Sequence, residues 1–312
     1  MNSKTDHLNK AASPEFHTYQ KHAQYYLNFS QKNKANWEKI ETNFPQIQRA
    51  WETINNSTSL PIDVQDREQM VLDFLYSLDE FLEMRGLFRE NIAWLQRALE
   101  AAQKLNQPMI IGRLGQDIGW CYRNLGETHN ALEHLNLALA IRQKFGPPVG
   151  EAATLNMLGV VYDDLGNPHQ ALHYLEKALE IRIETSDNKG ESITRNNIAA
   201  VYFDLGQWEK AETHYMAALD LAKTHKDELD YAGTLNNLGE IAMAKGNLDK
   251  AAQYFKDALE IFDKLGDLVH YGTTLNNLGL TIHHCGKPRD GISYLESALQ
   301  LQRRFGQDTE IS

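Results

Sequence analysis

The sequence has few of the features that mark secreted, membrane-spanning or disulfide-stabilised proteins. Only two cysteines occur among 312 residues, Cys121 and Cys285, so no disulfide framework is available and a reducing cytoplasm is the expected location. No early apolar run resembles a signal peptide, and none reaches membrane-spanning length. Glycine and proline are too scarce for a disordered chain. We therefore expect a folded cytoplasmic protein that does not enter a membrane.

Motifs of catalysis and cofactor binding are also missing. The sequence has no GxSxG or HExxH motif, no plausible Ser/His/Asp arrangement and no phosphate-cradling GxxxxGK[ST] loop. His169 and His173 are one helical turn apart but lack a third ligand, and His283, His284 and Cys285 are adjacent, so they would point about 100° apart on a helix. These absences predict a protein that is not an enzyme and holds no cofactor or metal.

Positive charge is in deficit. The chain has 31 Lys and Arg against 42 Asp and Glu, a formal net charge of −11, and the acidity lies beyond residue 60. A strongly acidic surface repels a phosphate backbone, so nucleic acid is not the expected partner.

The dominant positive feature is a period of 40 residues. Glycines recur without a slip at Gly86, Gly126, Gly166, Gly206, Gly246 and Gly286. An Ala-Leu pair recurs at the same interval, beginning at Ala98, Ala138, Ala178, Ala218, Ala258 and Ala298. Such a period indicates one supersecondary unit that has been copied and stacked.

Each unit reads as a helix hairpin. In residues 152–191, apolar residues at helical spacing stop at Gly166, which suits a left-handed helix end, and Pro168 suits the first turn of a second helix. Small residues such as Gly159 and Ala171 recur where the paired helices must approach closely. We predict six hairpins within residues 66–312, at 72–111, 112–151, 152–191, 192–231, 232–271 and 272–311.

The combination Leu158-Gly159, Tyr162, Gly166 and Ala171 resembles the tetratricopeptide repeat, in the long variety found in kinesin light chains and in bacterial regulators. The resemblance covers the repeats and implies an all-α fold, a right-handed superhelical solenoid of helix hairpins whose first helices line a concave groove. It implies little about function.

Residues 15–65 are predicted to form an N-terminal helical cap and a linker, behind a disordered tail at 1–14. The cap has two apolar stripes at helical spacing, one of them through Trp37, Phe44 and Trp51. This segment resembles the helices that join the ATPase core to the repeat sensor in bacterial STAND-class regulators.

The main candidate site is a ladder of carboxamides at one repeat position: Gln116, Asn156, Asn196, Asn236 and Asn276. A carboxamide both donates and accepts, so a row of them suits the backbone of an extended peptide. The alternative is that these side chains brace neighbouring helices. Farther along the same helices we expect a mixed apolar and acidic lining, formed by Trp120, Asp163, Phe203, Glu240 and Met243.

This lining would suit a protein or extended peptide with basic and hydrophobic residues, although it could also be a solvated acidic surface. The predicted function is a non-catalytic binding scaffold. One alternative is a peptide-responsive signalling receptor, resembling quorum-sensing repeat regulators, whose solenoid changes pitch; another is a structural oligomer. The last repeat has an apolar face with no visible cap, which predicts a homodimer through that repeat or a longer natural chain.

Overall fold

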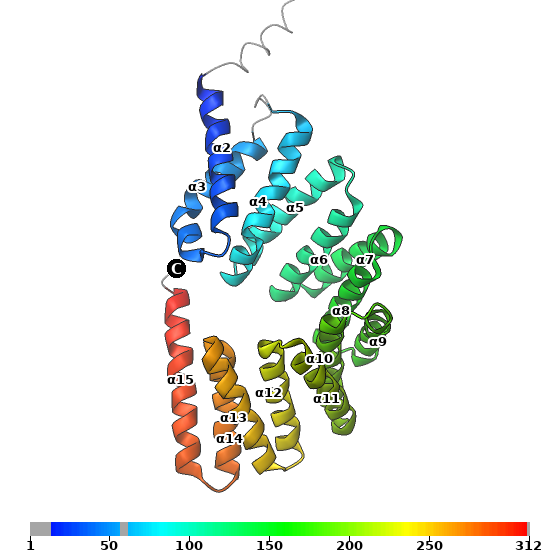
Figure 1. Ribbon diagram of the computed structural model, residues 1–312, viewed down its shortest axis with the longest axis vertical. Coiled ribbons are helices and arrows are strands. Elements are labelled where there is room, and N and C mark those ends of the chain that lie inside the picture. The colour runs from blue at the N-terminus through cyan, green and yellow to red at the C-terminus, as the bar shows by residue number, and fades with distance from the viewer. Residues whose placement is uncertain (1–13, 57–61, 311–312) are drawn as a thin grey trace, which may run out of the picture. The chain divides into compact units, whose positions relative to one another are not determined.

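A computed structural model describes residues 14–56 and 62–310, and this part of the chain is entirely helical (Figure 1). The helices are α2 (Pro14–Asn33), α3 (Trp37–Asn56), α4 (Val64–Met84), α5 (Phe88–Lys104), α6 (Pro108–Asn124), α7 (Thr128–Phe145), α8 (Pro148–Asp164), α9 (Pro168–Glu184), α10 (Asn188–Asp204), α11 (Trp208–His225), α12 (Glu228–Ala244), α13 (Leu248–Leu265), α14 (Leu268–His284) and α15 (Pro288–Glu310). Among these helices, none is long and apolar enough to cross a membrane.

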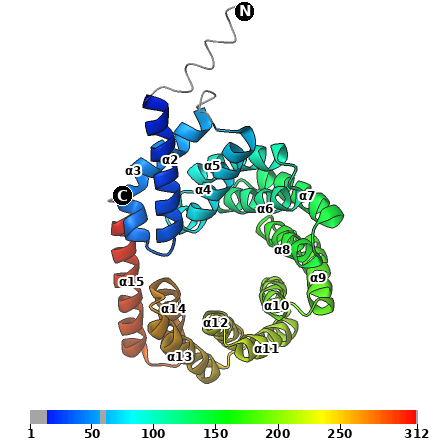
Figure 2. The same ribbon diagram turned by 45° about the horizontal axis from the view of Figure 1, so that its top comes forward.

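Consecutive helices pack as hairpins, and the chain divides into two compact units, Met1–Met157 and Leu158–Ser312. The first unit contains the α2–α3 hairpin, which packs against α4, and the hairpins α4–α5 and α6–α7. In the second unit, α10, α12 and α14 lie in one row in which α12 contacts both of the others, and α11 and α13 lie in a second row beside it (Figure 2). Successive stacking of this kind confirms the predicted all-α solenoid of helix hairpins.

The structural hairpins begin a few residues before the repeat windows chosen from the sequence. The first helix of the second predicted repeat starts at Pro108, for example, and not at 112. The 40-residue period is unaffected. From Pro108 onward, the first helix of each hairpin starts 40 residues after the first helix of the preceding hairpin. The predicted tail and linker fall largely on residues 1–13 and 57–61, which lie outside the described part.

The glycine at the end of each first helix has the conformation that the sequence indicates. All six, from Gly86 to Gly286, have φ between 65° and 78°, a left-handed backbone that only glycine adopts without cost. In the second unit, Pro168 occupies the start of α9 as expected, behind Asn167, whose side chain accepts a hydrogen bond from the backbone of Gln170. Local sequence therefore fixes both ends of the interhelix turn.

Close packing explains the small residues within each hairpin. A Cβ on Gly159 would lie 2.5 Å from Cγ of Leu175, and one on Gly239 would lie 2.5 Å from Cε1 of Phe255. Ala178, at the other small position, is fully buried. The helices of a pair therefore touch through these positions, and a larger residue there would force them apart.

The first unit has an aromatic and ionic core of its own. Trp51 of α3 stacks on Trp94 of α5 with ring centroids 4.1 Å apart. The fully buried carboxylate of Glu68 pairs with Arg97 at 2.7 Å and with Lys104 at 3.0 Å. Burial tends to raise the pKa of this carboxyl group, but the hydrogen bonds and charges of Lys104 and Arg97 outweigh it and lower the pKa. The Trp51–Trp94 contact joins the N-terminal hairpin to the repeats, and the ion pairs of Glu68 join α4 to α5.

Candidate functional site

The carboxamide ladder makes hydrogen bonds from one repeat to the next. In the first unit, the hydroxyl of Thr154 donates to Oε1 of Gln116 at 3.1 Å. In the second unit, Thr234 donates to Oδ1 of Asn196 at 3.1 Å, and Thr274 donates to Oδ1 of Asn236 at 3.2 Å. Each threonine follows its amide by 38 residues, so the contact always joins two neighbouring first helices.

The amide nitrogens of the ladder are also used. Asn196 donates through Nδ2 to Oδ1 of Asp230 at 3.1 Å, and Asn236 donates to Oε1 of Glu240 at 3.0 Å. These bonds support the bracing alternative for Asn196 and Asn236. Each amide oxygen keeps a second lone pair, so ligand contact by these residues stays a prediction.

The two remaining ladder residues are Asn156 and Asn276. Asn156 is buried, with only 8% of its surface exposed. Asn276 is partly buried, and within the described residues its side chain has no hydrogen-bond partner. A free carboxamide in the last repeat remains available to a ligand.

The other predicted lining residues are all partly buried: Trp120, Asp163, Phe203, Glu240 and Met243. The guanidinium of Arg123 lies 5.4 Å from the ring centroid of Trp120, and the sulfur of Met243 accepts a hydrogen bond from Thr281 at 3.4 Å. Burial raises the pKa of Glu240, against the hydrogen bonds that Asn236 and Asn277 donate to it. The lining is thus mixed in character, and its contact with a ligand stays a prediction.

A pocket of about 450 Å³ opens in the second unit at the N-terminal ends of α10, α12 and α14. Its lining combines aliphatic, amide and charged side chains: Lys189, Ile193, Asn196, Asn197, Asp227, Leu229, Asp230, Thr234, Asn237, Phe262 and His270, with Gly233. Ile193 is 41% exposed and Leu229 is 48% exposed. Asn237 is partly buried, and among the described residues its amide has no hydrogen-bond partner. We call this cavity the α10–α12 pocket.

Asp230 is the central polar group of the α10–α12 pocket. The hydroxyl of Ser192 donates to Oδ2 at 2.5 Å, and Asn196 donates to Oδ1 at 3.1 Å. Burial raises the pKa of Asp230, and the hydrogen bond from Ser192 partly offsets this. The nearby ammonium of Lys189 pairs with Asp227 at 3.2 Å. The pocket therefore holds one more carboxylate than cations.

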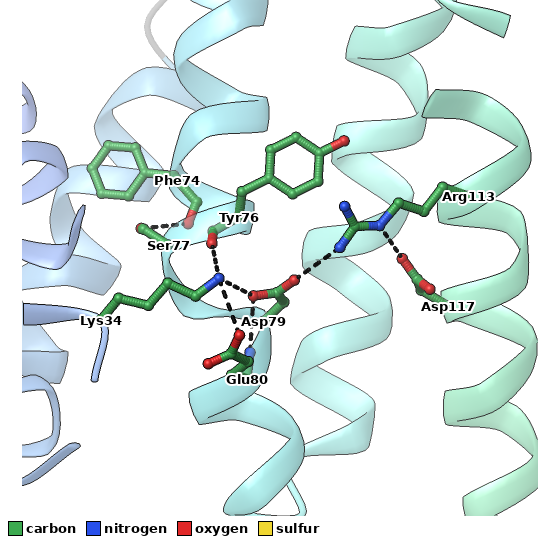
Figure 3. Close-up of polar contacts among 8 residues, drawn as sticks. All are labelled: Lys34, Phe74, Tyr76, Ser77, Asp79, Glu80, Arg113 and Asp117. Carbon is green, nitrogen blue, oxygen red and sulfur yellow. Dashed lines mark hydrogen bonds and ion pairs between the residues drawn. The ribbon is translucent and has the colours of Figure 1, made fainter. Parts of the chain in front are cut away.

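The corresponding face of the first unit is ionic (Figure 3). Arg113 pairs with Asp117, one turn along α6, at 3.6 Å, and with Asp79 of α4 at 3.5 Å. Asp79 also pairs with Lys34 at 3.4 Å, and Lys34 donates to the carbonyl of Tyr76 at 2.9 Å. Burial raises the pKa of Asp117 to about 6, although the charge of Arg113 acts against this. Lys34 also pairs with Glu80 at 3.4 Å, so five charged side chains from the turn after α2, from α4 and from α6 form one network of ion pairs.

Sequence reasoning missed the residues that complete these networks. The threonines at 154, 194, 234 and 274 recur at the same 40-residue interval as the ladder and stand two positions before its amides. That recurrence was the signal for a paired bond. Asn237 also recurs, as Asn197 and Asn277, and this repetition was a second signal, whereas Asp230 has no repeat signature of its own. No group of three His, Cys, Asp or Glu side chains that could hold a metal ion occurs in the described ranges 14–56 and 62–310.

Comparison with known families confirms the resemblance to repeat proteins. Residues 113–184 and 190–264 match the tetratricopeptide repeat family. No curated protein sequence matches the chain.

Solved structures share the fold at low sequence identity. The apo form of RapI is 16% identical, with a TM-score of 0.68 over 90% of this chain and 99% of that one. A Rap protein complexed with Competence and Sporulation Factor is 17% identical, with a TM-score of 0.64 over 92% of this chain and 78% of that one. A STAND protein with a tetratricopeptide repeat sensor from Pyrococcus horikoshii is 18% identical, with a TM-score of 0.63 over 92% of this chain and 45% of that one.

Proposed function

For a chain that carries tetratricopeptide repeats at 113–184 and 190–264, we propose that the function is non-catalytic binding of a protein or an extended peptide. The α10–α12 pocket is the proposed site. The observation that carries the proposal is the meeting of two exposed aliphatic side chains, Ile193 and Leu229, with the unpaired carboxamide of Asn237 in one cavity. Binding pockets in proteins commonly combine an apolar lining with a few fixed polar groups.

Asn237 is the residue that we expect to hold the peptide backbone. Its amide offers a donor and an acceptor, which match the carbonyl and N–H of one peptide unit regardless of side chain. Its neighbour Asn236 is occupied by Thr274 and Glu240. In this proposal Asn196 and Asn236 hold neighbouring first helices at a fixed distance from each other. Asn237 then contacts a ligand that lies between those helices.

The remaining predicted lining residues of the second unit fit the same proposal as contacts beyond the pocket. Phe203, Met243 and Asn276 lie on its first helices, and Trp120, on α6 of the first unit, stays a separate prediction. Hydrophobic anchors of the ligand would lie on the aromatic and thioether groups. An extended ligand could then be longer than the pocket itself.

The test is selection of random dodecapeptides, displayed on phage, against the immobilised full-length protein. We expect recovered peptides to bind Asn237→Ala about fivefold more weakly, because one hydrogen bond is worth roughly 1 kcal/mol. Gln170→Ala, which removes an exposed amide of α9, is the matched control and should bind as the wild type does. Recovery of no peptide, or equal affinity for Asn237→Ala and wild type, would contradict the proposed site.

The second candidate is a signalling receptor that changes shape when a peptide binds. The fold is shared with a Rap protein that was solved in complex with Competence and Sporulation Factor. Small-angle scattering with and without a recovered peptide separates the two candidates. A receptor should change its radius of gyration, whereas a rigid scaffold should keep it.

We also propose a homodimer through the last repeat, in a cytoplasmic location. On α15, Ile292 is 48% exposed and Leu299 is 45% exposed, which leaves an apolar stripe uncovered. Light scattering at tens of micromolar should show a dimer for the wild type and a monomer for Leu299→Glu. A monomeric wild type would rule out this interface.

A further inference from the structure

The carboxylate of Asp230 has only uncharged hydrogen-bond donors. Ser192 donates to one oxygen and Asn196 donates to the other. The nearest cation, Lys189, is engaged with Asp227, and its side chain is 74% exposed. On the α14 side of the pocket, His270 bonds to Asp267 through Nδ1 at 2.7 Å and stacks on Phe262. No cation is therefore committed to Asp230 within the described residues.

Asp230 is partly buried, and a partly buried carboxylate without a cation is energetically costly. Two neutral donors recover part of the lost hydration, but a cation that approaches within hydrogen-bond distance recovers more, because charge-assisted bonds are about twice as strong as neutral ones. The remaining charges of the pocket lining, Lys189 and Asp227, cancel each other. The pocket as a whole thus favours a ligand with a positive group.

The aliphatic residues determine what kind of cation fits. Ile193 and Leu229 line the same pocket as Asp230 and are both exposed. Lysine and arginine lay their methylene stems along apolar surface and extend a charged head beyond it. A small inorganic cation would gain nothing from these two side chains.

We propose that Asp230 is a specificity-determining residue that selects partners presenting a lysine or arginine side chain. The stem of that side chain lies along Ile193 and Leu229, and its head pairs with the carboxylate. This inference rests on the proposed function, because it assigns the side-chain preference of the same pocket.

The first test is the composition of the peptides recovered by phage selection. Lysine and arginine should be enriched at one position of the recovered dodecapeptides. A synthetic peptide with arginine at that position should bind the wild type about tenfold more tightly than its isosteric, uncharged citrulline analogue. In Asp230→Asn, the two peptides should differ less than twofold.

The control is Asp220→Asn, which makes the same charge change at an exposed position of α11. It should keep the tenfold preference for arginine. In the wild-type protein, zero-length carbodiimide coupling should also join a lysine-containing recovered peptide to Asp230, as read by mass spectrometry. This second measurement needs no variant and stands even if Asp230→Asn does not fold.

The outcomes separate the two proposals. If no peptide is recovered, the proposed function and the inference both fail. If peptides are recovered without enrichment of lysine and arginine, or couple to other carboxylates and not to Asp230, binding stands and selection by Asp230 is overturned. Equal preference for arginine in wild type and in a folded Asp230→Asn also overturns it.

Discussion

The two units present different chemistry from the same helix positions. On α6 of the first unit, the pair one turn apart is Arg113 and Asp117, which form an ion pair extended to α4 and to the turn that follows α2. In the second unit the same positions carry uncharged residues, which are Ile193 and Asn197 on α10, Gly233 and Asn237 on α12, and Thr273 and Asn277 on α14. At these positions the first unit therefore pairs its charges internally, whereas in the second unit Asn237 has no hydrogen-bond partner among the described residues.

The framework beneath these surfaces is the same in both units. A tight glycine faces a large side chain in each, Gly119 against Leu135 and Gly239 against Phe255. A threonine-to-amide bond joins neighbouring first helices in each, from Thr154 and from Thr234. Recognition can thus vary along the array without a change in the packing that holds it together.

The largest expected effect tests the shared framework. Gly239→Ala would place a Cβ 2.5 Å from the Phe255 ring, and we expect a loss of about 2–3 kcal/mol in the free energy of unfolding, measured in urea. Gly119→Ala should cost somewhat less, because the flexible Leu135 can move. Gly233→Ala on the same helix as Gly239 meets nothing within 4 Å and should be neutral or stabilising by up to about 1 kcal/mol. If the three variants had the same free energy of unfolding in urea, the close packing at Gly239 and Gly119 would be contradicted.

A second prediction separates bracing amides from free ones. Asn236→Ala removes bonds with Thr274 and Glu240 and should lower the free energy of unfolding by about 1–2 kcal/mol. Asn276→Ala, at the same repeat position but without a partner among the described residues, should change it by less than about 0.5 kcal/mol. In the first unit, Thr154→Val should resemble Asn236→Ala. The bracing role fails if Asn236→Ala and Asn276→Ala unfold at the same urea concentration.

The third prediction concerns Asp117→Asn, which gives the first unit the asparagine that the second unit has at the same repeat position. Burial raises the pKa of Asp117 to about 6 from 3.8, so between about pH 4 and 6 the folded state binds a proton more readily than the unfolded chain does. The wild type should therefore lose stability as pH rises through this window. Asp117→Asn removes the titration and should be more stable than wild type at pH 7.

Because the Asp117 side chain keeps 29% exposure and an ion pair with Arg113, we expect this gain to be only about 1 kcal/mol. The gain should vanish near pH 4, where the wild-type carboxyl group is protonated. Thermal unfolding at pH 4 and 7 measures both values. A gain that does not depend on pH would show that the raised pKa is not its cause.

The smallest effect concerns turns between repeats. Lys226 ends α11 with φ of 57°, and Asn106, after α5, has φ of 52°. Left-handed backbone is costly for lysine and milder for asparagine. Glycine relieves this strain but adds freedom to the unfolded chain, so Lys226→Gly should stabilise by only a few tenths of a kcal/mol. Asn106→Gly should stabilise less, and the reverse order of melting temperatures would contradict this account.

The sequence predicted the framework well because the framework repeats. Gly166 reappears as Gly126 and Gly206 in the same conformation, and a turn that needs a left-handed residue leaves the same mark each time. The seam at Gly159 and Ala178 was visible for the same reason. The array of hairpins could therefore be predicted from the sequence alone.

The candidate site could be predicted only in part. In the pair Asn236-Asn237 both residues are amides, and only the interhelix distances decide that Asn236 bonds to Thr274 while Asn237 is free. Asp230 carries no signature, because its environment comes from Ser192 on a neighbouring helix and not from its own repeat. Surface residues that differ from one repeat to the next cannot be predicted from the 40-residue period of the sequence.

The 38-residue separation between each amide and its threonine has a consequence for how such an array can grow. When a 40-residue stretch that begins at residue 152 or later is copied in tandem, wherever the copy begins, the amide in it again finds a threonine 38 positions later. A duplication therefore preserves this bond without the need for matched endpoints in the gene. Exchange of a single repeat with an unrelated array has no such protection, because it separates the two halves of the bond at both junctions.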